Sequence, residues 1–129
     1  MKNNTHLLRY LKFEKVLKCS KELNQISKTE NSKIRNNLIK VARDCVIDAI
    51  SEIAKNCLYG NIPLKTCDFN KLKKFQNILR RLSKKSRVHQ RKKILIQKGG
   101  FLNLLIPPAL TLIASIVGDL IKKKIRANE

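Results

Sequence analysis

Apolar residues recur every three to four positions along most of the chain, and this spacing predicts helices rather than strands. The first stripe lies in residues 7–17, where apolar side chains recur three and four residues apart. A second helix is predicted from Ser32, a residue type that caps helix N-termini. Its expected buried face comprises Ile34, Leu38, Val41 and Ala42.

A third helix is predicted from Asp44, another capping residue type. Gly60 and Asn61 supply a stop signal, and Pro63 follows where a helix cannot readily continue. The expected buried face of this helix comprises Cys45, Ala49, Ile50, Ile53, Ala54, Cys57 and Leu58.

The residues after Pro63 predict two cationic amphipathic helices. The first starts at Thr66 and carries Phe69, Leu72, Phe75, Leu79 and Leu82 at helical spacing. The second covers residues 87–98. No stretch alternates apolar and polar residues long enough to suggest a sheet. The predicted fold class is therefore all-α: a small bundle of three to four short helices, a basic amphipathic helical segment, and an apolar C-terminal helical tail.

Charge divides the 129 residues into three segments. The head, residues 1–64, has a net charge of +6, whereas residues 65–98 hold 13 basic side chains and a single acidic one, Asp68. The tail, residues 99–129, has a net charge of +2. The total of +20 is too large for an ordinary enzyme of neutral metabolites and indicates an anionic partner.

The basic segment is the predicted polyanion-binding site. A row of cations is often only a solvated helix face, but a net charge of +12 within residues 65–98 repels itself unless a polyanion neutralises it. About 8–12 phosphate contacts would give a slope of about −7 to −11 in log affinity against log salt. No zinc-finger spacing or RNA-recognition aromatics are present to read bases, so we expect non-specific binding to the backbone of duplex DNA. The candidate contacts are Lys71, Lys73, Lys74, Arg80, Arg81, Lys84, Lys85, Arg87, Arg91, Lys92, Lys93 and Lys98.

Residues 101–121 form an apolar tail between Gly99-Gly100 and a lysine cluster. As one helix they would span about 31 Å, just enough for a bilayer. Pro107 and Pro108 are expected to break this helix, which favours self-packing or shallow membrane insertion over a straight span. The face expected to make these contacts comprises Leu110, Ile113, Val117 and Leu120.

Candidate chemistry is sparse. Cys19, Cys45, Cys57 and Cys67 form no C-x-x-C pair and match no common zinc spacing, so we predict no metal site and no cofactor. Cys45 and Cys57 are expected to be buried on apolar helix faces as reduced thiols. Reduced thiols are typical of proteins made inside the cell. The acids Asp44, Asp48 and Glu52 are expected to balance nearby cations rather than to catalyse a reaction, and no enzyme activity is predicted.

The sequence Lys98-Gly99-Gly100-Phe101-Leu102-Asn103-Leu104-Leu105-Ile106-Pro107 resembles the end of the adenovirus core protein X precursor. There, a DNA-condensing region is followed by Gly-Gly and an apolar tail. With residues 49–54 and 58–64 added, the chain is similar over roughly residues 34–121 to small basic proteins of Polinton (Maverick) elements and adintoviruses. The resemblance implies a virion core protein that condenses DNA, located in the virion and the host nucleus, with capsid proteins as partners.

The resemblance also implies maturation by a viral cysteine protease. Gln97 would be the outer specificity residue, Gly99 and Gly100 would precede the cut, and Phe101 would follow it. The alternative is that Gly99-Gly100 is only a hinge. For the whole chain, the alternatives are a membrane-active or membrane-anchored capsid accessory that uses the apolar tail, and an RNA- or ribosome-associated basic protein.

Overall fold

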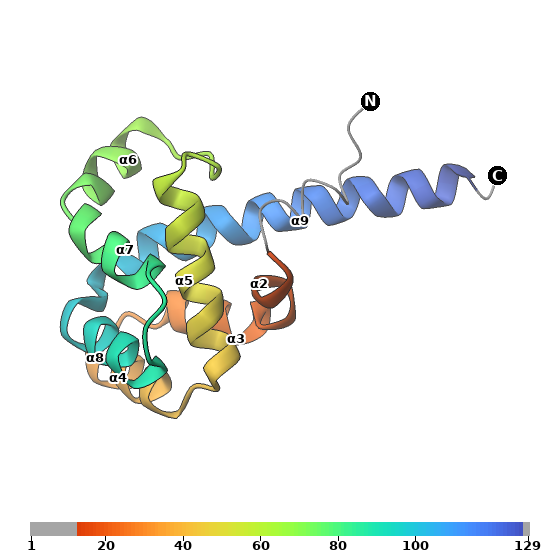
Figure 1. Cartoon of the computed structure of the whole chain (residues 1–129). Coiled ribbons are helices and arrows are strands. Elements are labelled where there is room, and N and C mark those ends of the chain that lie inside the picture. Colours follow the sequence, from red (N-terminus) through yellow and green to blue (C-terminus); the bar gives the residue numbers. More distant parts are fainter. Residues whose placement is uncertain (1–12, 128–129) are drawn as a thin grey trace.

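The computed structural model describes residues 13–127, and this part of the chain is all-α with no strand. α5 (Asp44–Leu58) lies in the middle of the bundle, and the other helices surround it (Figure 1). These are α2 (Glu14–Lys18), α3 (Ser20–Lys28), α4 (Ser32–Val41), α6 (Thr66–Lys73), α7 (Gln76–Ser83), α8 (Val88–Lys98), the 3₁₀ turn η1 (Gly99–Phe101) and α9 (Leu102–Ala127). The predicted all-α bundle with an apolar C-terminal helix is confirmed.

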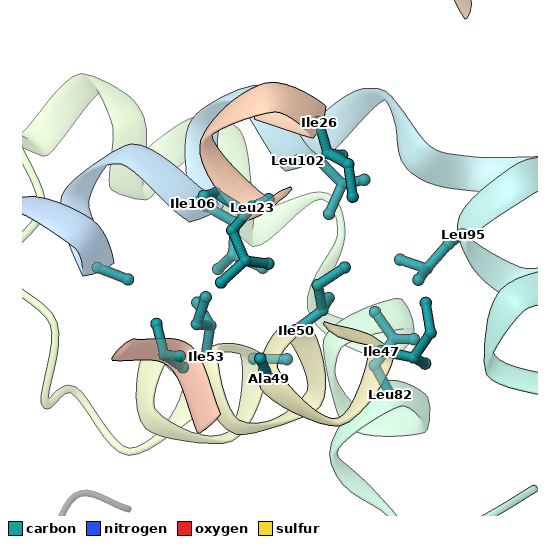
Figure 2. Packing of buried hydrophobic residues seen from close by; sticks show 14 of the residues in the cluster. Leu23, Ile26, Ile47, Ala49, Ile50, Ile53, Leu82, Leu95, Leu102 and Ile106 are labelled. Atoms are coloured by element: carbon teal, nitrogen blue, oxygen red, sulfur yellow. The ribbon is translucent and has the colours of Figure 1, made fainter. Parts of the chain in front are cut away.

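One aliphatic core joins the three charge segments. α5 packs against α2, α7, α8 and α9, while α3 packs against α9 and α4 against α8. Figure 2 shows side chains from α3, α5, α7, α8 and α9 converging in this core. Its largest fully buried members are Phe13 and Phe101, followed by aliphatic side chains that include Leu23, Ile50, Leu82, Leu95 and Ile106. The head, the basic segment and the tail therefore fold around the same apolar interior.

The predicted helix starts at Ser32, Asp44 and Thr66 are correct to within one residue. α4 is capped by Asn31, whose Oδ1 accepts hydrogen bonds from the backbone N–H groups of Lys33 (2.9 Å) and Ile34 (3.2 Å). Ser32, the predicted cap, is instead the first helical residue. Asp44 and Thr66 likewise lie in the first turns of α5 and α6, where the Asp44 carboxylate still complements the helix dipole.

The predicted stop after α5 is confirmed. Gly60 adopts a φ of 72°, the left-handed conformation that glycine tolerates best, and its N–H donates to the carbonyl of Cys57 (3.1 Å). The N–H of Tyr59 donates to the carbonyl of Lys55 (3.1 Å). These bonds satisfy the last carbonyls of α5 and turn the chain toward α6.

Two predicted helix faces are correct only in part. Leu38 and Ala42 of the α4 face are partly buried against the core, and four of the five apolar residues predicted after Thr66 are buried or partly buried. In α4 the buried side chains are Arg35 and Ile39, whereas Ile34 and Val41 of the predicted face are 55% and 79% exposed. Both faces have spacings of three to four residues, and the packing of α4 against α8 selects between them. The helix predicted from Thr66 through Leu82 is two helices, α6 and α7, and Phe69 of its expected apolar face is half exposed. For the stripe in residues 7–17, residues 7–12 lie outside the described part of the chain.

The predicted break at Pro107 and Pro108 is also wrong, because both prolines lie inside α9. Each proline removes one backbone hydrogen bond from the helix. The carbonyl groups that lose their partners belong to Asn103, which is exposed, and Leu104, which is half-buried, so they lie on a side of α9 that water reaches. Burial of Leu105, Ile106 and Ala109 on the opposite side offsets this loss.

α9 uses its apolar face as part of the core. Five side chains at helical spacing, Leu102, Leu105, Ile106, Ala109 and Ile113, are buried against the bundle. Leu110 and Val117, from the predicted packing face, are partly buried against the same core. The side chain of Leu120 lies outside the described set. The C-terminal part of α9 extends beyond the other helices (Figure 1).

A substitution in α9 tests whether this helix belongs to the core. We expect Ile106→Ala to lower the free energy of unfolding by about 2–5 kcal/mol, because it leaves a cavity between α9 and the bundle. The control substitution Thr111→Ala, on the exposed side of α9, should alter the free energy of unfolding by less than about 0.5 kcal/mol. Urea unfolding followed by far-UV circular dichroism measures both. Equal stability of the two variants would show that α9 does not pack as described.

Candidate nucleic-acid interface

A cationic groove lies between the end of α7 and α8. Its volume is about 540 Å³, and Arg81, Lys84, Lys85 and Lys93 supply four cations to its lining. No carboxylate of the described residues lines it, and neither does any Phe or Tyr of that part of the chain. Such a groove concentrates positive potential, and its described lining lacks the Phe and Tyr rings on which bases usually stack.

Three uncharged donors in the groove were not predicted from the sequence. Ser86, His89 and Gln90 line it beside the four cations. Ser86 and His89 lie at the N-terminus of α8, where the helix dipole adds partial positive charge. Hydroxyl, imidazole and amide groups commonly bind phosphate oxygens next to Lys and Arg. Their position in the middle of the basic segment was the only sequence signal available for them.

The structure separates the other predicted contacts into two groups. Lys71, Lys73 and Lys74 lie on or directly after α6, which packs on α9 and lies away from α8 in Figure 1. The ammonium group of Lys73 lies 5.5 Å from the ring centre of Phe69. The remaining cations, Arg80, Arg87 and Lys98, are exposed but do not line the groove. The basic segment therefore presents a groove and at least one separate cluster rather than one continuous stripe.

Arg91 holds α8 against α5 and points into the protein. It is only 8% exposed, and its guanidinium contacts Asp48 Oδ1 at 2.8 Å and donates to Ser51 Oγ at 2.9 Å. Asp48 also pairs with Lys15 at 3.5 Å, so this acid balances nearby cations as predicted. With Nη1 and Nη2 both engaged inside the protein, Arg91 holds α8, one wall of the groove, against α5, while its buried Nε has no hydrogen-bond partner.

Lys92 plays a similar internal role against α4. Its Nζ donates to the carbonyl oxygens of Lys40 (2.9 Å) and Ala42 (2.8 Å), at the C-terminal end of α4. A cation at this end of a helix satisfies free carbonyls and complements the dipole. Lys92 therefore docks α8 on α4, while the adjacent Lys93 is exposed in the groove.

A larger pocket, of about 930 Å³, lies next to the groove but has mixed charge. Its lining includes Asp48 and Glu52 together with Lys55 and Tyr59, and it shares Lys84 and Lys85 with the groove. Carboxylates repel phosphate, so this pocket suits a polyanion less well than the groove does. Among the described residues, no group of three or more His, Cys, Asp or Glu side chains could hold a metal ion.

The residues of the candidate protease site lie in and around η1. Gln97 is exposed on the rim of the groove and Gly100 is exposed, whereas Gly99 is buried and Phe101 is fully buried. The Phe101 ring packs against Phe75 with 5.5 Å between ring centres. A protease that binds an extended strand would have to unwind η1 before it could cut after Gly100.

The neighbouring residues Lys92 and Lys93 provide a matched test of the two roles. We expect Lys92→Met to lower the free energy of unfolding by about 1–2 kcal/mol, because two carbonyl groups lose a charged donor. Lys93→Met should alter the free energy of unfolding by less than about 0.5 kcal/mol but should weaken DNA binding. Chemical denaturation and DNA titration by fluorescence anisotropy measure the two effects. If Lys93→Met lowers stability while Lys92→Met mainly weakens DNA binding, the internal role of Lys92 and the groove role of Lys93 are wrongly assigned.

No protein-family model, curated protein or solved structure matches this chain. The candidate interface is accordingly defined by its own geometry. It is a groove with four cations and no carboxylate among the described residues that line it, and one of its walls, α8, is held in place by Arg91 and Lys92.

Proposed function

We propose that this protein is a non-enzymatic DNA-binding protein that holds the phosphate backbone of duplex DNA without sequence specificity. The observation that carries the proposal is the groove between α7 and α8, where four cations line one concavity without a carboxylate from the described residues. Four cations in one concavity repel one another, and phosphates that enter the groove would relieve this repulsion.

The chemistry of the groove favours phosphate over base recognition. Lysine and arginine bind phosphate oxygens, and Ser86 and Gln90 add neutral donors that suit the same oxygens. Base-specific readout would require an element that fits the major groove with side chains matched to base edges, and single-strand binding would require stacking aromatics. The exposed cations of α6 would contact a second stretch of backbone, which supports condensation of DNA rather than recognition of one site.

The resemblance to basic proteins of Polinton elements, adintoviruses and adenoviruses supports a virion core as the setting. In this proposal the protein neutralises packaged genomic DNA in the virion and the host nucleus, and the head contacts capsid proteins or other copies of the chain. Cleavage after Gly100 by a viral cysteine protease would separate α9 from the bundle. Because α9 supplies core residues, that cut would also loosen the fold.

A charge-matched pair of variants tests the proposal. The groove variant carries Arg81→Gln, Lys84→Gln, Lys85→Gln and Lys93→Gln. The control variant loses the same charge from exposed lysines of the head, with Lys18→Gln, Lys21→Gln, Lys28→Gln and Lys33→Gln. Each phosphate contact contributes about 0.9 to the slope of log affinity against log salt. We therefore expect the groove variant to reduce the magnitude of that slope by about 3–4, and the control variant by less than about 1.

The slopes are measured by fluorescence anisotropy of a labelled duplex at several salt concentrations. Equal slopes for the two variants would show that net charge alone attracts DNA and that the groove is not the site. A full-length protein that fails to bind duplex DNA at low salt would refute the proposal as a whole.

The alternative function is that of a membrane-active capsid accessory, and one observation favours it. The stretch Val88–Asp119, across α8, η1 and α9, is long and apolar enough to cross a membrane by length and composition. Of the residues in its apolar window, 39% are buried inside the protein, and the others would be the ones to meet a bilayer.

Flotation with anionic liposomes separates the two functions. DNA binding through phosphates predicts that any association with liposomes is electrostatic and is lost at about 1 M salt, where charge interactions are screened within about 3 Å. Insertion of the apolar helix predicts that the protein floats with liposomes at the same salt concentration. Flotation of the intact chain in high salt would therefore favour the membrane function.

A further inference from the structure

Two cysteines that are distant in sequence face each other at one corner of the bundle. Cys19 lies between α2 and α3, and Cys45 lies in the first turn of α5. Their Sγ atoms are 3.3 Å apart, and both residues are free thiols. Cys19 is fully buried and Cys45 is half-buried, so solvent reaches the pair from the Cys45 side.

A second contact joins the same two segments. Arg43, two residues before Cys45, pairs with Glu22, three residues after Cys19, at 2.6 Å. An exposed ion pair of this kind adds little stability. Together with the Lys15–Asp48 pair at 3.5 Å on the other side of the thiols, it shows that the two segments lie side by side around Cys19 and Cys45. The buried neighbours Val16 and Val46 fix the backbone around them.

We propose that Cys19 and Cys45 are a modification site: an oxidisable thiol pair that forms a disulfide on reaction with a low-molecular-weight disulfide such as glutathione disulfide. The sulfur atoms need to approach by little more than 1 Å to reach a bond length of about 2.05 Å. This site is separate from the cationic groove, and the proposal does not depend on DNA binding.

The reaction takes place in two exchange steps. Cys45, the more accessible thiol, loses its proton to solvent, and its thiolate attacks one sulfur of glutathione disulfide and releases one glutathione thiolate. Cys19 then loses its proton and attacks Cys45 Sγ, which releases the second glutathione thiolate. The two leaving thiolates take up the two protons. The protein thiols lose two electrons and one glutathione disulfide gains them.

The environment of Cys19 controls the rate of the second step. Burial, followed by the contact with Cys45, raises the pKa of the Cys19 thiol to about 11. Because the thiolate is the attacking species, ring closure should be slow near neutral pH. Burial, the larger cause, remains after Cys45 has become a mixed disulfide, so the rate should rise by about tenfold per pH unit above neutral pH.

The cross-link would stabilise the head without altering the groove. It would close the loop that contains α3 and α4, and a loop of this length restricts the unfolded chain enough to raise the melting temperature by about 10 °C. None of the residues that line the groove belongs to this corner of the bundle. DNA affinity should therefore be the same for the oxidised and the reduced protein.

The experiment uses the full chain, reduced and then incubated with glutathione disulfide. We expect intact mass spectrometry to show the loss of two hydrogen atoms, with no glutathione retained on Cys19 or Cys45; the exposed Cys67 can take up one glutathione independently. Peptide mapping should link Cys19 to Cys45. The melting temperature should rise by about 10 °C and return to its starting value after reduction with dithiothreitol.

Matched cysteine variants distinguish this pair from the other thiols. Cys57→Ser combined with Cys67→Ser should keep the reaction, the mass change and the rise in melting temperature. Cys19→Ser should stop after the first step and retain one glutathione on Cys45, and Cys45→Ser should not close the bond. If the wild-type chain gives only glutathione adducts, or links that involve Cys57 or Cys67, the proposal is wrong. The double variant decides the question even if substitution at Cys19 impairs folding.

Discussion

The aliphatic core around α5 has to hold the cationic helices α7 and α8 beside each other against their mutual repulsion. Burial of Leu82 from α7 and Leu95 from α8 supplies much of this attraction, since both side chains are fully removed from water. Two polar contacts then fix α8 in position: Arg91 binds Asp48 of α5, and Lys92 binds the carbonyl end of α4. Two cations of the basic segment are thereby used inside the protein so that others can line an open groove.

This arrangement links stability to function through charge. Four groove cations in one concavity oppose folding by repulsion, and a bound polyanion would remove that cost and favour the folded state. The folded state also needs apolar contacts to offset that repulsion, and the apolar tail supplies some of them. α9 packs Leu102, Leu105 and Ile106 onto a core that the short helices of the head could not complete alone.

The sequence predicted the helical class, the stop after α5 and the concentration of charge in residues 65–98 because each depends on local properties. Helical spacing, glycine at a left-handed position and uncompensated lysines can all be read without knowing the partners of a segment. The errors have a common physical origin. Ile34 and Val41 formed a plausible apolar face, yet α4 buries Arg35 and Ile39, since its contact with α8 is a tertiary choice.

Net charge, helical periodicity and the lack of an evident metal motif were thus determined by the sequence itself. Tertiary structure decided which cations are available: Lys92 and Lys93 are adjacent and chemically identical, but only the packing of α8 on α4 directs one inward and the other into the groove. Tertiary packing also explains why α9 continues past two prolines: its buried contacts outweigh the backbone hydrogen bonds that the prolines remove. The meeting of Cys19 and Cys45 likewise follows only from long-range packing, which no spacing along the chain encodes.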